Sequence, residues 1–354
     1  MAIYLHDKYA KKIQAAFSTE SFITGRLSED YDFSGAKTVK VATPITVPMV
    51  DYKREGTSRY GDPVEMQDTV QEMTLTQDKA FTLTIDKGND MDQSGIKAAG
   101  KMLALQMAER AIPMMDQYVF ETLSKKAGKI IGKGEALTKS NICERISEGT
   151  LHLDDSEVPQ NFRTLFVSAE TYKLLKHSDE FMKVEELGAA ALAKGQVGQY
   201  DNMAVVKVPH SRWPANVNFM IVYKNRATAP VKLSDTKLHQ DPPGISGNLL
   251  EGRQYYDCFV FGAKCDGVYV EVNTASGKGG IVAAPAITES GAITCATEGA
   301  QICFTTDGSD PRYSVSAKQG NQAAKEPGLA KTLVRAYAFK DGLFPSGVSE
   351  TELK

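Results

Sequence analysis

The feature that most constrains this chain is a long polar β pattern followed by a long helical pattern, neither of which can bury itself. Residues 38–90 alternate between apolar and polar types, and residues 91–127 repeat apolar types at three- and four-residue spacing. A β segment this polar offers too little apolar surface to offset the entropy that the chain loses on ordering. We therefore expect contacts from outside to stabilise it, most simply from another copy of the chain. The pattern predicts an assembly protein.

Charge is divided between the two neighbouring segments. Residues 51–92 carry five basic and ten acidic side chains, whereas residues 93–134 carry seven basic and three acidic ones. Two interpretations remain open. The charges cluster by chance on solvent-facing surfaces, or the acidic segment of one subunit lies over the basic helix of the next, where complementary potentials set the register. The second interpretation predicts inter-subunit contacts at Asp62, Glu65, Asp68, Lys97, Lys101 and Arg110.

Composition excludes several classes of protein. The 354 residues are 42% hydrophobic and 24% charged, which is ordinary for a globular protein of two or three domains. A net charge of -3 and a pI of about 6.0 give no general attraction to nucleic acid. The five cysteines form no CxxC pair and are interpreted as reduced thiols. Because the N-terminus lacks an apolar signal core and no later stretch spans a bilayer, we expect cytosolic assembly without membrane contact.

No group of residues predicts enzyme chemistry. The five histidines are scattered and no HExxH motif occurs, so each is better explained as a solvated or core residue. Ser168 follows an apolar strand but lacks the GxSxG elbow of a nucleophile, and we expect it to cap a helix. The glycines of residues 127–136 lack Walker A spacing, and the aspartates of residues 154–155 and 307–310 lack an EF-hand pattern. We expect no catalytic site, cofactor or metal.

Periodicity predicts the order of the elements in the first half of the chain. Residues 1–35 are typical of an arm, with one short amphipathic helix near residues 13–17. Residues 39–85 predict a long β-hairpin with a turn-rich tip. The helix that follows contains Pro113, where we expect a kink or a break.

The second half alternates between helix and strand. Strands are predicted at residues 164–167, 203–208 and 219–223. Glycines and prolines at residues 242–252 indicate a loop-rich crossing before a pair of strands at residues 255–263 and 267–272. The sequence TASGKGG at residues 274–280 has the composition of a flexible linker. Behind it, short strands with regular turns predict a small β-sandwich.

Four stretches carry a family resemblance, and they are IPMMDQYVFETL (112–123), NFRTLFVSAETYKLLK (161–176), GQVGQYDNMAVVKVP (195–209) and QYYDCFVFGAKCDGVYV (254–270). In this order the chain resembles the major capsid proteins of tailed bacteriophages, the Hong Kong 97-type fold, over residues 1–275. The resemblance implies an α+β fold with an N-terminal arm (1–35), a peripheral domain (36–139) with an extended loop (50–86) and a spine helix (91–127), an axial domain (140–254) and return strands (255–275). No residue matches the lysine–asparagine crosslinks of some members. The residues before the first strand are too few for a fused scaffolding domain.

The tail resembles a second family. The stretches SGAITCATEGAQICFTTDGSDPRYS (290–314) and TLVRAYAFKDGLFPSGVSE (332–350) are similar to the immunoglobulin-like C-terminal domain of chitobiase and β-hexosaminidase type. The mark of that domain is a turn, formed here by Thr305, Thr306, Asp307, Gly308, Ser309, Asp310 and Pro311. The domain is non-catalytic in that family, so hydrolase activity does not follow from it. The resemblance implies a linker at residues 276–282 and an Ig-like domain at residues 283–354.

The two resemblances together predict a major head protein that self-assembles into an icosahedral shell around double-stranded DNA and displays the Ig-like domain outside. The implied partners are hexamers and pentamers of the chain itself, a separate scaffolding protein, a portal protein, enclosed DNA without sequence-specific binding, and surface glycans. Because the linker separates the tail, we expect truncation after Gly280 to leave closed shells. Two alternatives stay open: an encapsulin-like compartment that encloses an enzyme cargo, and a secreted carbohydrate-binding or carbohydrate-active protein.

Overall fold

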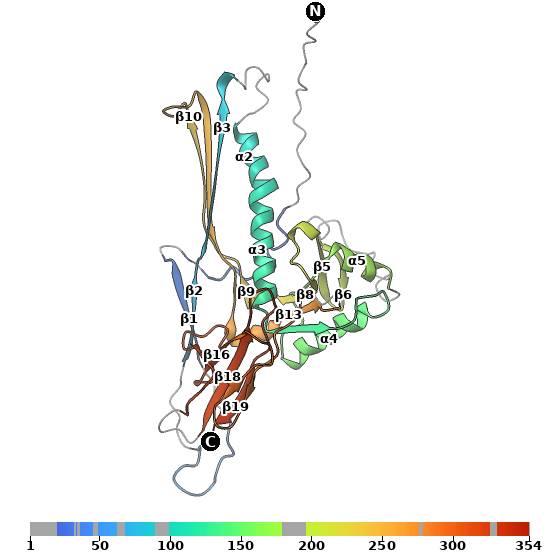
Figure 1. The fold of residues 1–354 in the computed structure, drawn as a ribbon, viewed down its shortest axis with the longest axis vertical. Coiled ribbons are helices and arrows are strands. Elements are labelled where there is room, and N and C mark those ends of the chain that lie inside the picture. The colour runs from blue at the N-terminus through green and yellow to red at the C-terminus, as the bar shows by residue number, and fades with distance from the viewer. Residues whose placement is uncertain are drawn as a thin grey trace, which may run out of the picture.

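The computed structural model describes residues 20–31, 33, 36–44, 49–61, 68–88, 99–178, 196–275, 279–325 and 331–353. A long helix runs beside a long three-stranded sheet, and a six-stranded sheet with its helices lies on the other side of the helix (Figure 1). The C-terminal strands lie at the end of the molecule opposite the free end of the long sheet (Figure 1). The predicted N-terminal helix near residues 13–17 lies outside the described residues.

A six-stranded mixed sheet forms the centre of the molecule. Its strands in spatial order are β4 (Lys129–Lys133), β13 (Val268–Asn273), β8 (Val217–Tyr223), β5 (Arg163–Ser168), β7 (Met203–Val208) and β6 (Gln196–Tyr200). Every residue of β5 and of β8 is buried. Strands covered on both faces have continuous apolar sequences, and such short apolar runs were the signal that identified these strands. The predicted strands at residues 164–167, 203–208 and 219–223 are confirmed.

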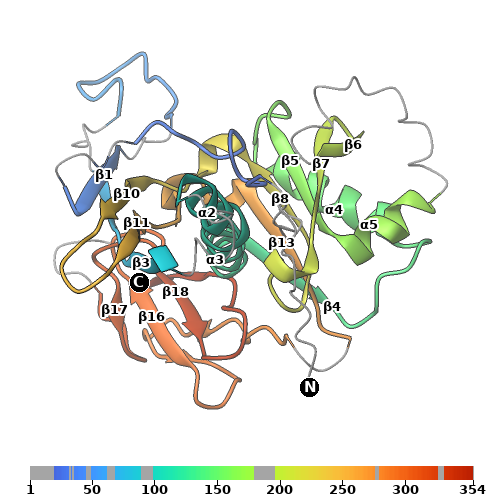
Figure 2. The same ribbon diagram turned by 90° about the horizontal axis from the view of Figure 1, so that it is seen from above.

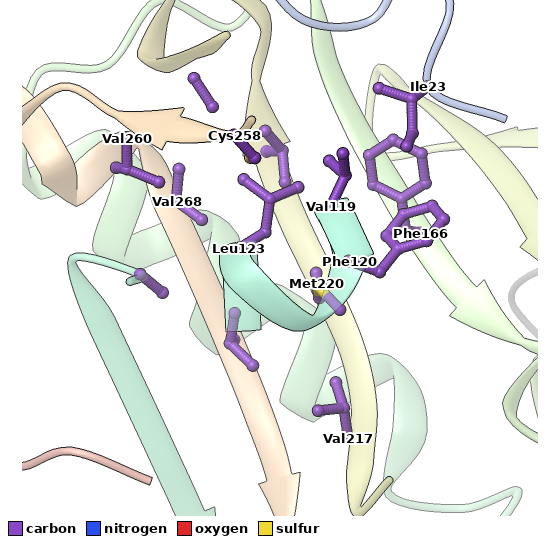
Figure 3. Close-up of a cluster of buried hydrophobic side chains, with 14 of the residues drawn as sticks. Ile23, Val119, Phe120, Leu123, Phe166, Val217, Met220, Cys258, Val260 and Val268 are labelled. Atoms are coloured by element: carbon purple, nitrogen blue, oxygen red, sulfur yellow. The ribbon is translucent and has the colours of Figure 1, made fainter. Parts of the chain in front are cut away.

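Helices cover both faces of this sheet. On one face lie α4 (Ile142–Asp155) and α5 (Ala169–Lys176), and on the other lies α3 (Ile112–Lys125). Figure 3 shows Val119, Phe120 and Leu123 of α3 packed against Phe166 and Met220 of the sheet. Ser168 caps α5, since its hydroxyl accepts a hydrogen bond from the Thr171 N–H at 3.0 Å, as the sequence predicted.

The long helix continues through Pro113 by means of a π-helical turn. Helix α2 (Ala99–Gln106) leads into a π turn (Met107–Ala111) and then into α3. The Ile112 N–H bonds to the Met107 carbonyl, five residues back, so the wider turn accommodates a proline that has no N–H and would crowd the carbonyl four residues before it. Viewed end-on, α2 and α3 superimpose (Figure 2). The expected break at Pro113 is absent.

The long sheet corrects the sequence reading of residues 231–256. Strands β10 (Val231–Gln240) and β11 (Gly247–Tyr256) form a hairpin, and β11 pairs along its whole length with β3 (Gln77–Asp86). The predicted loop-rich crossing is therefore wrong for residues 247–252, which belong to β11, whereas residues 242–246 do lie in the turn of the hairpin. The glycines allow close contact rather than marking a loop: a Cβ on Gly252 would lie 2.3 Å from the Phe81 ring, and one on Gly247 would lie 2.0 Å from the Ile85 carbonyl oxygen.

The predicted hairpin exists but is shorter than expected. Strand β1 (Thr38–Pro44) pairs with β2 (Asp68–Thr74) in antiparallel register from Thr38–Thr74 to Pro44–Asp68. Strand β3 does not belong to this hairpin, because its hydrogen bonds go to β11. The described part of the tip, residues 49–61, extends toward the C-terminal strands (Figure 1).

Short elements connect these sheets. Strands β9 (Ala227–Thr228) and β12 (Phe259–Val260) pair with each other, whereas β13 pairs with β4 and β8. The predicted strand at residues 267–272 is confirmed as β13, but its pairing with residues 255–263 is wrong, because a 3-10 turn (Gly262–Gly267) directs the two segments to different sheets. Two further 3-10 turns are His210–Arg212 and Lys224–Arg226.

The C-terminal residues form a four-stranded sheet packed on a two-stranded ribbon. The larger sheet has the order β17 (Lys318–Gln319), β16 (Gln301–Thr305), β18 (Thr332–Phe339) and β19 (Ser349–Leu353), and the ribbon pairs β14 (Ala286–Ile287) with β15 (Ile293–Thr294). Phe304 and Val334 of the sheet pack with Ile293 of the ribbon. The prediction of short strands behind residue 280 is confirmed.

Candidate assembly interface

The tip of the β1–β2 hairpin exposes large apolar side chains. Met49 is 100% exposed and Tyr60 is 85% exposed, and Val50 and Tyr52 are also exposed. The rings of Tyr52 and Tyr60 meet edge to face with centroids 5.0 Å apart, so the tip presents an aromatic surface rather than scattered residues. Grouped exposed apolar residues mark interaction sites.

A hollow of 360 Å³ lies between the long sheet and the long helix. Phe81 of β3 forms one wall, and Ala111, Pro113 and the exposed Met114 form the other. Arg110 and Glu109 line the same hollow. It therefore combines apolar walls with charged side chains, which is the composition of a site for a protein segment.

The predicted contact residues are divided between the two ends of the molecule. Asp68 begins β2 opposite Pro44 and is exposed, whereas Lys101 is exposed on α2 and Arg110 is exposed in the π turn. Asp62, Glu65 and Lys97 lie outside the described residues. The described part of the hairpin tip and α2 lie toward opposite ends of the long axis (Figure 1). The structure therefore gives no contact within one chain between Asp68 and Lys101 or Arg110, the three predicted residues that it describes.

A buried carboxylate fixes the N-terminal segment to the long helix. Asp116 of α3 is 0% exposed and accepts hydrogen bonds from the Ser21 hydroxyl at 2.6 Å, from the Phe22 N–H at 3.2 Å and from Arg212 at 2.8 Å. Burial raises the pKa of Asp116, while these hydrogen bonds act in the opposite direction. Phe22, Ile23 and Leu27 then enter the main core. Sequence patterns do not reveal this clamp, because Asp116 lies in an otherwise helical pattern.

The outer face of the long sheet carries paired charges. Arg253 of β11 bonds both oxygens of Asp78 on β3, at 2.9 and 2.6 Å. Beside this pair, the His239 imidazole lies 3.1 Å from the Glu251 carboxylate. Such cross-strand pairs fix the register of β10, β11 and β3 and keep this face solvated.

The C-terminal domain is docked on the body of the protein, which corrects the prediction of a separating linker. Arg312 donates hydrogen bonds to the carbonyl oxygens of Ala127 and Gly128, each at 2.9 Å, directly after α3 ends. The Tyr313 hydroxyl bonds the carbonyl of Lys126. Burial alone would lower the pKa of Arg312, but its hydrogen bonds with Asp310 leave that pKa raised. The guanidinium is thus a fixed cation at the negative end of the long helix.

Two further contacts extend the docking surface. Gln71 of β2 forms a bridge with Ser314, and its side-chain amide donates to the Val260 carbonyl at 2.8 Å. On the other side, Phe344 lies in the main core, its N–H bonds Gly280 O at 3.0 Å, and its carbonyl accepts from Val282 N at 2.9 Å. The C-terminal end of the predicted linker, at residues 280–282, is therefore paired with the domain it was expected to release. Residues 276–278 lie outside the described residues.

The predicted turn motif of residues 305–311 is a closed hydrogen-bonded loop. Asp307 accepts from the Ser309 N–H at 3.0 Å, the Thr305 hydroxyl donates to the Ser309 carbonyl at 2.6 Å, and Gly308 has a φ of 74° that favours glycine. These bonds confirm the interpretation as a turn. Asp310 instead orients Arg312, a role that the motif did not reveal.

Within the described part of the chain, no three His, Cys, Asp or Glu side chains group as metal ligands, and no helix is long and apolar enough to span a membrane. All five cysteines are free, as the sequence predicted. Burial raises the pKa of Cys258 and of Cys265 to about 12, so neither thiol is a ready nucleophile.

Comparison with solved structures finds the same fold in phage particles. A chain of Mycobacterium phage Che8 has a TM-score of 0.61 at 15% identity, over 77% of this chain and 98% of that one. Chains from the capsid of Cyanophage P-SCSP1u and from the mature capsid of bacteriophage PhiM1 have TM-scores of 0.60 and 0.57 at 13% identity. They cover 76% and 77% of this chain, and 93% and 92% of their own lengths.

The chain has a phage capsid fold. At such low identity the likeness concerns the fold alone. No family model matches the sequence, and no curated protein matches it.

Proposed function

We propose that this protein is the major capsid protein of a tailed bacteriophage, a structural protein without enzymatic activity. The observation that carries the proposal is the near-complete coverage of capsid chains, 92% of one chain and 93% of another. This chain therefore contains nearly every part of the fold of those capsid subunits. The product is an icosahedral shell of hexamers and pentamers around double-stranded DNA, assembled in the host cytoplasm.

In this assignment, the peripheral domain consists of the long helix and the β10–β11–β3 sheet. The axial domain consists of the six-stranded sheet with α4 and α5. The β1–β2 hairpin is the extended loop, which places the loop at residues 38–74 rather than at residues 50–86. This revision follows from strand pairing, because β3 and the 231–256 hairpin form one sheet.

The hairpin tip of one subunit then docks on the long helix and long sheet of a neighbour. The exposed Met49 and Tyr60 supply apolar area, and the hollow between Phe81 and Met114 receives it. Asp62, Glu65 and Asp68 face Lys97, Lys101 and Arg110 across this contact. Obligate interfaces of this kind bury about 2,000–5,000 Å², which is enough to order an arm that cannot order itself.

The C-terminal domain is an Ig-like module of chitobiase type displayed on the outside of the shell. Supporting this, the structural matches leave about a quarter of the chain uncovered, and residues 283–325 and 331–353 form a small domain with its own core. Surface glycans are the partner class for such a module. A separate scaffolding protein and a portal protein complete the set of assembly partners.

Electron microscopy of the expressed protein tests the proposal. Expression together with its scaffolding protein should give closed particles with hexameric and pentameric capsomers. Particles from infected cells should contain DNA. A protein that stays monomeric at high concentration with its scaffolding protein present would overturn the assignment, and a shell filled with an enzyme cargo would favour the encapsulin-like alternative.

A further inference from the structure

A small cationic pocket lies at one end of the central strands of the six-stranded sheet. It encloses 290 Å³ and is lined by Arg26, Arg163 and Lys224, with the amide side chains of Gln199 and Asn202. Topology explains the grouping. Strands β5 and β7 run parallel and begin at this end, while β8 runs antiparallel and ends there. Arg26 arrives from the N-terminal segment, which is held in the core on either side by Ile23 and Leu27.

The positive charge of this pocket is not balanced by the described residues. Arg163 pairs with Asp154 at 2.6 Å. The Arg26 guanidinium and the Lys224 ammonium have no hydrogen-bond or ion-pair partner in the described part of the chain, and no acidic side chain lines the pocket. Burial lowers the pKa of Arg26, and no neighbouring anion opposes this. Two cations held together without a counter-ion repel each other, so the arrangement favours a bound anion.

The rim of the pocket carries a strained, exposed aromatic residue. Phe162 has a φ of 65° and is 72% exposed. Its carbonyl accepts a hydrogen bond from the Lys224 N–H at 3.2 Å, which fixes the backbone beside the cation. Left-handed backbone at a bulky residue is costly and concentrates at ligand-binding sites.

We propose that this pocket binds a phosphate dianion, either free or as the terminal phosphate of a larger molecule. The two unbalanced cations match a dianion in charge, whereas a single carboxylate would leave one of them uncompensated. The planar guanidinium of Arg26 presents two N–H groups to two phosphate oxygens, and the Asn202 amide adds a neutral donor. The volume lies at the lower limit of the roughly 300–1,000 Å³ that small-molecule sites occupy, so the pocket selects a small ion.

Calorimetric titration of the full-length, unassembled protein with inorganic phosphate tests the site, with ionic strength held constant by sodium chloride. Wild-type protein should bind one phosphate saturably at millimolar concentration or below. Arg26→Gln and Lys224→Gln should each weaken binding at least ten-fold, and Arg26→Lys should weaken it less. Lys176→Gln, which removes an exposed lysine of α5, is the matched control and should bind as wild type does.

Further arms identify the source of the phosphate and guard against misfolding. If a 5′-phosphorylated oligonucleotide binds more tightly than inorganic phosphate, and its unphosphorylated form does not bind, the ligand is a terminal phosphate. If the phosphorylated oligonucleotide and inorganic phosphate bind with equal affinity, the ligand is the free ion. Circular dichroism confirms folding, and Lys224 is half-exposed, so its variant remains informative if Arg26→Gln unfolds. Absence of saturable binding, or equal affinity in wild type, Lys224→Gln and Lys176→Gln, would overturn the proposal.

Discussion

Arg312 lies 2.9 Å from the carbonyl oxygen of Ala127, although 185 residues separate the two in the chain. The last carbonyls of a helix have no partner within the helix and carry partial negative charge. The Tyr313 hydroxyl bonds the carbonyl of Lys126, the C-cap of the long helix. Arg312 bonds two carbonyls just beyond that end, and Asp310 holds its guanidinium in place at 2.7 Å. The C-terminal domain therefore acts as a cap on the main helix of the body.

Replacing Arg312 by alanine should lower the free energy of unfolding by about 3 kcal/mol, because a buried charge pair loses one member and two carbonyls lose their donor. Chemical denaturation of the subunit measures the change. Arg335→Ala breaks an exposed pair with Glu350 at 3.1 Å and serves as the control, with an expected loss of about 0–1 kcal/mol. Equal effects of the two substitutions would contradict the capping role.

Truncation after Gly280 should now impair folding, contrary to the expectation from the linker composition. The truncated chain loses Phe344 from the main core and Tyr313 from its contact with the end of α3. Removing one large core side chain costs about 3–5 kcal/mol. We expect insoluble protein or a clearly lower melting temperature, measured by expression and thermal unfolding. Closed shells of normal yield from the truncated chain would restore the idea of a detachable domain.

The strands that the sequence identified are of two kinds. Some are buried on both faces, and others alternate strictly between buried and partly exposed residues. Strand β8 is buried throughout, and β18 alternates residue by residue, so local pattern sufficed in both. The hairpin of β10 and β11 was not predicted, because the prolines and glycines at residues 242–252 have the composition of a loop. Only the structure shows that Gly252 leaves room for the Phe81 ring of a strand that is distant in sequence.

The candidate interface was only partly predictable for a related reason. The net charge of a segment is summed over many residues, so the acidic segment at the hairpin tip and the basic segment of the long helix could be recognised in the sequence. Single contacts such as Asp116 with Arg212 and Arg312 with Ala127 join positions about a hundred or more apart. Nothing in local spacing encodes such pairs, and neither the N-terminal clamp nor the docked domain could be inferred.

Gly128→Ala should be strongly destabilising. A Cβ at Gly128 would lie 2.2 Å from the Cys265 carbonyl oxygen and 2.6 Å from the Asp266 nitrogen, and both are backbone atoms that cannot rotate away. We expect a loss of at least about 3 kcal/mol, in the range of other severe packing defects. Gly134→Ala is the matched control, because nothing lies within 4 Å of its Cβ position. Similar melting temperatures for the two variants would argue against close packing of β4 on the 3-10 turn.

The stabilisation that Asp307 provides should depend on pH below its ordinary pKa. Burial would raise the pKa of Asp307, but hydrogen bonds from Ser309 and Ser316 outweigh it and lower that pKa below 3.8. A carboxyl with a lower pKa in the folded state stabilises fully above 3.8 and loses this contribution as pH falls through the folded value.

The difference in unfolding free energy between wild type and Asp307→Ala should therefore be constant from pH 7 down to about pH 5 and shrink at more acidic pH. Denaturation at a series of pH values measures it. Asp341→Ala, at an exposed position outside the turn motif, is the control and should show no such change. If the difference in unfolding free energy grows as the pH falls, the pKa of Asp307 is not lowered in the folded protein.

Charge reversal at the hairpin should block assembly without unfolding the subunit. In the proposed contact, the triple variant Asp62→Lys, Glu65→Lys and Asp68→Lys places positive charge opposite Lys101 and Arg110 of the neighbouring subunit. The repulsion is strongest at low ionic strength, where the screening length exceeds about 10 Å. We expect the protein concentration needed for assembly to rise at least ten-fold, which corresponds to about 1.4 kcal/mol. Light scattering and electron microscopy measure assembly, and circular dichroism measures folding.

Two further variants separate docking from a general effect of charge. Adding Lys101→Glu and Arg110→Glu to the triple variant restores opposite signs and should recover assembly in part. Asp341→Lys adds positive charge on the C-terminal domain, at an exposed position outside the proposed contact, and should assemble as wild type does. If the triple variant forms normal shells in low salt, the charges at the tip do not guide docking, and the apolar contact of Met49 and Tyr60 must act alone.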